Sequence, residues 1–246
     1  MHISLAAEKI IEIGPVAITN TMLTSWIVIA LLLIVAGLAT RQIKAVPGKL
    51  QNFFEFAVES ILGMIENVTN DRKKAERFLP LVATLFIFII TANWIGLIPG
   101  FETIGKWEII DEAKILVPFF RQPSADLNMT LALAIIAMSA VQILGFSYLG
   151  FRYLKKFINF KSPIDFFVGF LETIGEFSRV ISFAFRLFGN IFAGAVLLMV
   201  ISFLIPYVVA VPFYGLELFV GFVQALVFAM LTTVFMYIAT LGHEEH

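Results

Sequence analysis

The chain has 246 residues, of which 60% are hydrophobic and 14% are charged, with a net charge of −1 and a mean hydropathy of +0.94. This composition excludes an ordinary soluble domain, which could not bury so much apolar surface. The balanced charge gives no indication of nucleic-acid binding. The sequence has no cysteine, and its three histidines lie near the chain ends, so we expect neither disulfides nor a metal or cofactor site in the core.

Long apolar runs predict an all-α, polytopic membrane protein that forms one integral membrane domain over residues 1–246. The predicted crossings are 22–39, 79–98, 126–150, 163–206 and 212–242. The last two are longer than the roughly 20 residues that an upright helix needs to cross a bilayer. We therefore expect them to form a long, strongly tilted hairpin that turns between Pro206 and Pro212.

Residues 46–70 have a different pattern, in which one face is largely apolar at helical spacing and acidic residues lie on other faces. The positions on the apolar face are Phe53, Phe56, Ala57, Ser60, Ile61, Met64 and Ile65. We interpret this segment as an amphipathic helix on the cytoplasmic membrane surface. A loop helix packed on a partner protein is the alternative interpretation.

Lysine and arginine residues predict the orientation of the chain, because they accumulate in cytoplasmic connections. The connections Thr40–Phe78 and Gly150–Ser162 hold eleven of them, whereas the opposite side holds four. Residues 1–21 and 99–124 are therefore expected outside, and the C-terminus is expected in the cytoplasm.

Arg186 lies inside an apolar stretch that runs from about Val180 to Tyr207. A charge in the middle of a membrane segment costs roughly 3 kcal/mol or more, and such residues usually serve a function. Arginine does not release its proton at accessible pH, so Arg186 suits a fixed positive charge better than a proton relay.

Other polar residues of this crossing share a face with Arg186 when they are placed at 100° per residue. These residues are Glu172, Arg179, Ser182 and Asn190, with Glu176 somewhat further round. In the last crossing, Glu217 and Gln224 are two turns apart and also share a face. The polar groups of one helix lie on the cytoplasmic side of Arg186 and the acid of the other on the external side. This arrangement indicates two offset half-pathways that meet at a fixed cation.

Each of these residues also has a structural interpretation. Arg186 and Glu217 could form a buried salt bridge that fixes helix packing. Glu172 could belong to a solvated face, and the Ser182 hydroxyl could bond back to its own helix. Asp126 is expected to cap the third crossing, with a role at the external entrance as the alternative. Asn93 could bond a neighbouring helix rather than line the external side.

Three elements of the sequence, taken together, resemble subunit a of bacterial F-type ATP synthases. They are Asn93-Trp-Ile-Gly-Leu-Ile-Pro-Gly100, Pro123-Ser-Ala-Asp-Leu-Asn-Met-Thr130 and Arg186-Leu-Phe-Gly-Asn190. Gln224 in the last crossing extends the match. The resemblance covers essentially the whole chain in order.

The resemblance implies a stator subunit in the bacterial plasma membrane, beside a rotating ring of c subunits and a peripheral stalk of b subunits. It implies that Arg186 keeps the incoming c-ring carboxylate ionised, with Asn190 and Gln224 as its polar neighbours. Glu217 would be the acid of the external half-channel, where other members place an acid at the position of Ala195. Ser182 and Glu172 would lie on the cytoplasmic side.

The resemblance also implies that the chain is not an enzyme by itself. It would translocate H⁺ or Na⁺, and we expect no nucleotide site, because no glycine-rich phosphate loop with lysine is present. Two other classes remain open at the level of sequence. One is a self-contained secondary transporter or channel that uses the Arg186–Glu217 pair, and the other is a structural membrane scaffold.

Overall fold

The computed structural model of this chain describes residues 7–13, 16–41, 48–110, 113–154, 156–157, 163–205 and 210–241. Five of its helices are long and apolar enough to cross a membrane. They are α1 (Asn20–Thr40), α3 (Arg72–Ile95), α4 (Leu127–Leu149), α6 (Pro163–Leu204) and α7 (Ala210–Thr240). The prediction of an all-α, polytopic membrane protein is therefore confirmed.

Some helix limits differ from the predicted ones. Charged or capping residues can extend a helix beyond the apolar run from which it was predicted. α3 begins at Arg72 rather than at residue 79, because the Asp71 side chain caps its N-terminus by accepting bonds from the amides of Lys73 and Lys74. A hydropathy pattern alone would not assign these charged residues of the first turn to the membrane helix. α3 also ends at Ile95 rather than at residue 98.

The last helix begins earlier than predicted, so the turn before it is shorter. α7 begins at Ala210, so Pro212 lies within its first turn. A proline is tolerated there because the first amides of a helix have no intrahelical acceptor. Pro206 lies outside the described residues.

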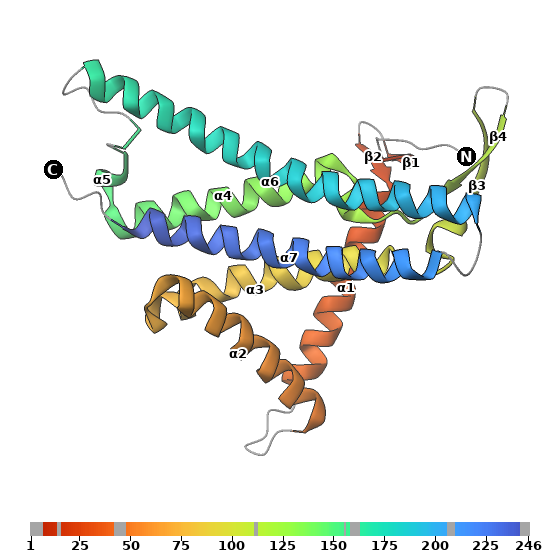
Figure 1. Cartoon of the computed structure of the whole chain (residues 1–246), viewed down its shortest axis with the longest axis horizontal. Coiled ribbons are helices and arrows are strands. Elements are labelled where there is room, and N and C mark those ends of the chain that lie inside the picture. Colours follow the sequence, from red (N-terminus) through yellow and green to blue (C-terminus); the bar gives the residue numbers. More distant parts are fainter. Residues whose placement is uncertain are drawn as a thin grey trace.

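Four of the long helices run side by side, with α3 packed on α7, and α4 packed on both α6 and α7 (Figure 1). α1 crosses this layer, and its buried residues all lie in its first nine positions. At about 1.5 Å per residue, α1 is about 31 Å long, close to the roughly 30 Å of a bilayer core, whereas α6 and α7 reach about 63 and 46 Å. Because α6 and α7 are longer than an upright crossing needs, their strong tilt in the bilayer stays a prediction.

The predicted amphipathic segment forms α2 (Lys49–Thr69), but its apolar face is divided. Ile61 and Ile65 are buried in the cluster that α2 shares with α3 and α7. Phe53 and Phe56 are exposed, because α2 diverges from α3 toward its N-terminus (Figure 1). Only the second half of α2 therefore packs on the helices of the bundle.

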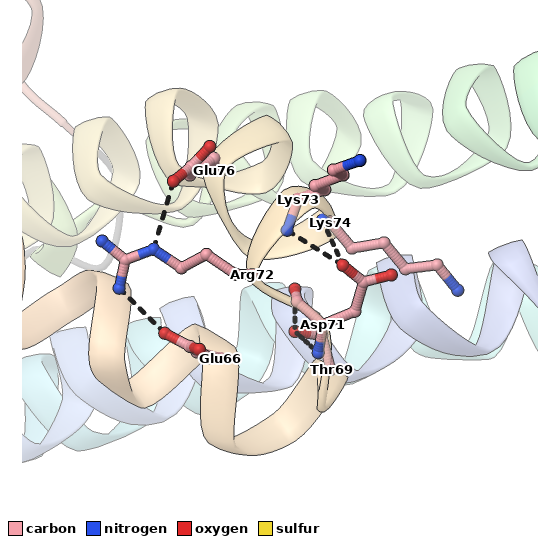
Figure 2. Close-up of polar contacts among 7 residues, drawn as sticks. All are labelled: Glu66, Thr69, Asp71, Arg72, Lys73, Lys74 and Glu76. Carbon is pink, nitrogen blue, oxygen red and sulfur yellow. Dashed lines mark hydrogen bonds and ion pairs between the residues drawn. The ribbon is translucent and has the colours of Figure 1, made fainter.

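The corner between α2 and α3 is held by polar contacts (Figure 2). Arg72 donates to Glu66 at 2.9 Å and to Glu76 at 3.1 Å. Asn70 adopts a left-handed conformation with φ of 49° and ends α2. Because the Arg72 pairs are exposed, they contribute orientation more than stability.

Two small antiparallel hairpins stand at the end of the molecule where α3 ends and α4 begins (Figure 1). One pairs β1 (Lys9–Ile13) with β2 (Val16–Thr19), and the other pairs β3 (Gly105–Ile110) with β4 (Ala113–Pro118). The short helices η1 (Phe101–Thr103) and η2 (Pro123–Ala125) flank the second hairpin. The segment 99–124, predicted only as an external loop, is thus partly structured. α5 (Phe151–Leu154) lies at the opposite end.

Candidate functional site

Arg186 lies on an exposed face of α6, together with Ser182 and Asn190. The other exposed positions of this face include Ile181, Phe185, Gly189, Ala193 and Leu197. Phe183 and Leu187, on the other side of the helix, are buried in the core of the bundle. The predicted polar stripe is therefore present on α6, and its residues Ser182, Arg186 and Asn190 are exposed.

The Arg186 side chain has no hydrogen bond or ion pair with any residue that the structure describes. Glu217, which is described as well, does not pair with it. The interpretation of these two residues as a buried salt bridge is therefore wrong for this structure. The Ser182 hydroxyl likewise does not bond back to its helix, and it lines a pocket instead.

This pocket lies between α6 and α7, and Arg186 is one of its walls. It is lined by Ser178, Arg179, Ser182, Phe183 and Arg186 of α6, and by Leu231 and Phe235 of α7. The pocket reaches from Arg179, two turns before Arg186, to Arg186 itself. It therefore lies on the side of Arg186 that the sequence analysis places toward the cytoplasm.

Four charged residues gather next to this pocket. Lys156 lies 2.7 Å from Glu172 and 3.8 Å from Glu176. Arg179 pairs with both acids and covers the Phe235 ring at 4.9 Å. One carboxylate oxygen of Glu176 is buried without a hydrogen-bond partner. Glu172 is thus part of a half-buried ion-pair network rather than of a solvated face.

The sequence analysis missed Lys156, because it comes from the segment after α5 and reaches α6 only in three dimensions. Tyr153 fixes this segment. Its hydroxyl donates to Gln142 of α4 at 2.8 Å, and its ring fills the space beside Gly145. Burial raises the pKa of Tyr153 to about 12, so the hydroxyl stays protonated and remains a donor.

On the other side of Arg186, one turn along α6, Asn190 joins α6 to α7. Its side-chain amide donates to the Gln224 carbonyl oxygen at 2.6 Å. The Gln224 amide nitrogen is buried and has no partner. The structure thus brings together Asn190 and Gln224, which the sequence analysis had placed near Arg186.

Glu217 is buried on α7, with 5% of its surface exposed. Its carboxylate lies against Gly194 of α6, where a Cβ would overlap it. The contact is made by Gly194, which directly precedes Ala195, the position where other members of the resembled family place an acid. The glycine matters here because α6 and the carboxylate could not come this close around any side chain.

Asn93 and Trp94, near the end of α3, hold the same part of α7. The Asn93 amide donates to the Gly221 carbonyl at 2.9 Å, and the Trp94 indole donates to the Leu218 carbonyl at 3.0 Å. Asn93 therefore bonds a neighbouring helix, as one of its two interpretations expected. Its carbonyl oxygen is buried and has no partner, which costs about 1–3 kcal/mol unless another group satisfies it.

Asp126 caps α4, as expected, by accepting a bond from the Asn128 amide at 3.0 Å. Its other oxygen accepts a bond from the Thr21 hydroxyl of α1 at 2.8 Å. The residue is buried and ties α1 to α4. Both oxygens therefore have a structural role.

The chain is similar to known proteins over most of its length. The sequence profile of the family described as ATP synthase A chain matches residues 22–237. The chain is 38% identical to ATP synthase subunit a of Geotalea daltonii over 214 residues, which are 86% of this chain and 83% of that protein. It is 38% identical to subunit a of Campylobacter jejuni over 216 residues, 87% of this chain and 86% of that one. With subunit a of Gloeobacter violaceus it shares 35% identity over 236 residues, 96% and 89% of the two chains.

The profile match and these relatives cover most of the chain, and the profile includes Arg186, Glu217 and Gln224. The chain therefore belongs to the ATP synthase subunit a family.

Proposed function

We propose that Arg186 is the fixed cation that separates two half-channels in this subunit a and holds a carboxylate of a c-subunit ring in its ionised form. Membership of the family makes the chain a non-catalytic, proton-translocating membrane subunit of an ATP synthase. The roles of single residues in this subunit, and the neighbouring subunits on which they act, are what we propose.

The observation that carries the proposal is the position of Arg186. It is exposed on α6 beside apolar or small residues and the polar Ser182 and Asn190, and it has no hydrogen-bond or ion-pair partner among the described residues. A guanidinium at membrane depth is costly without a counter-charge. A carboxylate on an adjacent protein would supply that charge, and the small residues Gly189 and Ala193 on the same face allow close approach.

The external half-channel would follow α7. Glu217 would take up the ion from outside, and Asn93, Gln224 and Asn190 would line the way to Arg186. Support comes from the burial of Glu217 and from the hydrogen bond between Asn190 and Gln224. Asp126 would lie near the external entrance, where it fixes α4 against α1.

The cytoplasmic half-channel would be the pocket between Arg179 and Arg186. Ser182 lines it, and Glu172 belongs to the charged network at its far end. The two half-channels then end on opposite sides of Arg186. An ion would pass from one to the other only on the rotating ring, because a fixed positive charge stands between the two half-channels. Each charge that moves across 100 mV provides about 2.3 kcal/mol, so a leak between the half-channels would waste that energy.

We also propose that the chain lies in the bacterial plasma membrane, with its N-terminus outside and its C-terminus in the cytoplasm, as its basic connections indicate. A peripheral stalk of b subunits would hold it against the torque of the ring. The transported ion would be H⁺, and Na⁺ is the alternative. The carboxylate site of the c ring would determine which of the two ions is carried. A self-contained transporter is not favoured, because Arg186 has no hydrogen bond or ion pair with any residue that the structure describes, Glu217 included.

The proposal is tested by Arg186→Ala in the assembled synthase. Inverted membrane vesicles should lose ATP-driven proton pumping while the subunit remains present in the complex. Normal pumping by the variant would refute the assignment. Purified subunit alone, reconstituted in liposomes, should conduct few protons, whereas rapid flux would favour the self-contained transporter.

A further inference from the structure

We propose that three residues of the connection between α4 and α6, Tyr153, Lys156 and Phe157, form a brace that fixes the first half of α6, and that Tyr153 is the positioning residue of this brace. The brace is inferred from contacts within the chain. Its part in proton transfer on the cytoplasmic side rests on the function proposed above.

The first half of α6, residues 164–182, has almost no buried residues of its own. The structure describes the burial of all of these residues, and Gly169 is the only one that is buried. From Phe183 onward, α6 packs in the core of the bundle. At about 1.5 Å per residue, the first half is about 28 Å long, and it diverges from α4 toward its N-terminus (Figure 1). Its position therefore depends on the few contacts that it makes with the connection.

Gly169 packs directly on the backbone of the brace. A Cβ at this position would overlap the Phe157 carbonyl oxygen, and it would lie 2.9 Å from the Phe157 carbonyl carbon and 3.4 Å from the Lys156 carbonyl oxygen. These are backbone atoms, which cannot rotate away as the end of a flexible side chain can. The absence of a side chain at Gly169 thus lets α6 lie against the connection.

Lys156 extends this contact along the same face of α6. Glu172 and Glu176 follow Gly169 by three and seven positions, which places the three residues on one side of the helix. The Lys156 ammonium lies 2.7 Å from Glu172 and 3.8 Å from Glu176, and the side chains of Lys156 and Glu176 are only 16% and 13% exposed. The brace therefore holds α6 over two turns, by close packing at one end and by ion pairs at the other.

Tyr153 joins the brace to α4. Its hydroxyl donates to Gln142 at 2.8 Å, and its ring lies against Gly145, where a Cβ would be 2.6 Å from the ring carbon Cζ. The Tyr153 carbonyl accepts a bond from the Lys156 amide at 3.2 Å, and its ring meets the Phe157 ring edge to face at 5.6 Å. One residue thus contacts α4 and both of the residues that contact α6.

The brace acts on the cytoplasmic pocket through the charged residues of α6. Arg179 pairs with Glu172 and Glu176, and it lines the pocket that reaches Arg186. A shift of the first half of α6 would therefore move these groups relative to the second half, which the bundle holds. Tyr153 does not contact the pocket, so it acts only by positioning.

The first test uses the assembled synthase in inverted vesicles, with the ATP-driven pumping rate normalised to assembled complex. Gly169→Ala places a methyl group against the Phe157 backbone, so α6 or the connection must move. We expect a rate about fivefold to tenfold lower, because small displacements of functional groups have effects of this size. Gly175→Ala, the same exchange on the same helix, meets nothing within 4 Å and should pump normally. Equal rates in the two variants would overturn the proposal.

A milder variant tests Tyr153 itself. Tyr153→Phe keeps the ring and removes the hydrogen bond to Gln142, and we expect a rate about threefold lower, within the range that one lost hydrogen bond gives. Tyr148→Phe is the control, because its hydroxyl has no hydrogen bond with a residue that the structure describes. If Tyr153 acts through Lys156, Tyr153→Phe combined with Lys156→Gln should be no slower than Lys156→Gln alone. Effects that multiply, or a normal rate in Tyr153→Phe, would overturn the positioning role.

The position of α6 has a readout that does not depend on pumping. Ser178 is exposed and lines the pocket, and the chain has no cysteine, so Ser178→Cys reports on this part of α6. A membrane-impermeant thiol reagent should label it at a rate that changes at least threefold when Gly169→Ala is added and stays unchanged when Gly175→Ala is added. Unchanged labelling in both would overturn the brace.

Failure of this inference can be distinguished from failure of the proposed function. If pumping survives Arg186→Ala, the proposed function fails, whereas the labelling experiment still tests the brace. If Arg186→Ala abolishes pumping and Gly169→Ala behaves like Gly175→Ala in both experiments, only the brace fails.

Discussion

The carboxylate of Glu217 on α7 lies directly against Gly194 on α6, at the point where a Cβ on the glycine would occupy the same space. The acid is buried, yet it forms no ion pair with any residue that the structure describes. A buried carboxylate without a paired cation is unusual for a structural residue. α7 can therefore carry an acid at this position only because Gly194 has no side chain.

Gly194→Ala should displace Glu217 and slow proton uptake. The added methyl group overlaps the carboxylate, so either the acid or α6 must move, which costs about 1–3 kcal/mol when a packed site is overfilled. We expect a pumping rate about tenfold lower per assembled complex, because a shift of about 1 Å at a reacting group has effects of this size or larger. Gly63→Ala on α2, where a Cβ meets nothing within 4 Å, is the matched control. Equal rates in the two variants would contradict the contact.

Glu217→Gln should slow ion flow strongly and leave assembly intact. Glutamine keeps the size and the hydrogen-bonding groups of the side chain but does not titrate. Because Arg186 is not its ion-pair partner, removing the charge leaves no buried cation behind. The measurement is ATP-driven pumping together with the amount of subunit in the membrane. A normal pumping rate would exclude a proton-transfer role, whereas loss of assembly would favour a structural one.

The helices and the polar stripe of α6 could be predicted from the sequence because both are local patterns. Apolar runs give the five crossings, and a spacing of 3.6 residues places Ser182, Arg186 and Asn190 on one face. Which way that face points could not be predicted. The burial of Phe183 and Leu187 decides it, and that burial depends on packing against α4 and α7.

The residues that the sequence analysis missed are all defined by contacts between distant segments. The Gln122 side-chain amide donates to the Asn93 carbonyl across 29 positions, and Lys156 pairs with Glu172 from the segment after α5. Neither residue stands out in a hydropathy or charge pattern. The interpretation of Arg186 and Glu217 as a buried salt bridge was also wrong. Residues of opposite charge on neighbouring helices need not lie at the same depth, and the sequence does not show their depth.

Arg186→Lys should fail nearly as completely as Arg186→Ala. A lysine ammonium is a compact point charge, whereas guanidinium presents five donors in a plane and stays charged even when desolvated. If only a positive charge were needed, lysine would restore most of the activity. Pumping rates of both variants, compared at equal levels of assembled complex, distinguish these cases. Substantial activity in the lysine variant would contradict the need for a planar, permanently charged group.

The charged residues beside the pocket should influence proton release together, because they pair with one another. Lys156→Gln removes one cation from Glu172 and Glu176 and leaves their pairs with Arg179, so we expect slower proton release at the cytoplasmic side. Lys156→Gln combined with Glu172→Gln removes one charge of each sign and should recover part of the loss. The rates are measured in vesicles under a fixed membrane potential. Additive losses in the double variant would show that the two residues act independently.

The orientation of the chain can be tested directly, because the sequence contains no cysteine. Lys73 lies in the first turn of α3 and Lys106 lies in β3, and both side chains are exposed at opposite ends of the molecule. A membrane-impermeant thiol reagent should label Lys73→Cys only from the cytoplasmic side and Lys106→Cys only from outside. The expected result follows from the concentration of basic residues in cytoplasmic connections. Reversed labelling would exchange the two sides of Arg186, so that Glu217 would serve the cytoplasmic half-channel and the pocket at Arg179 the external one.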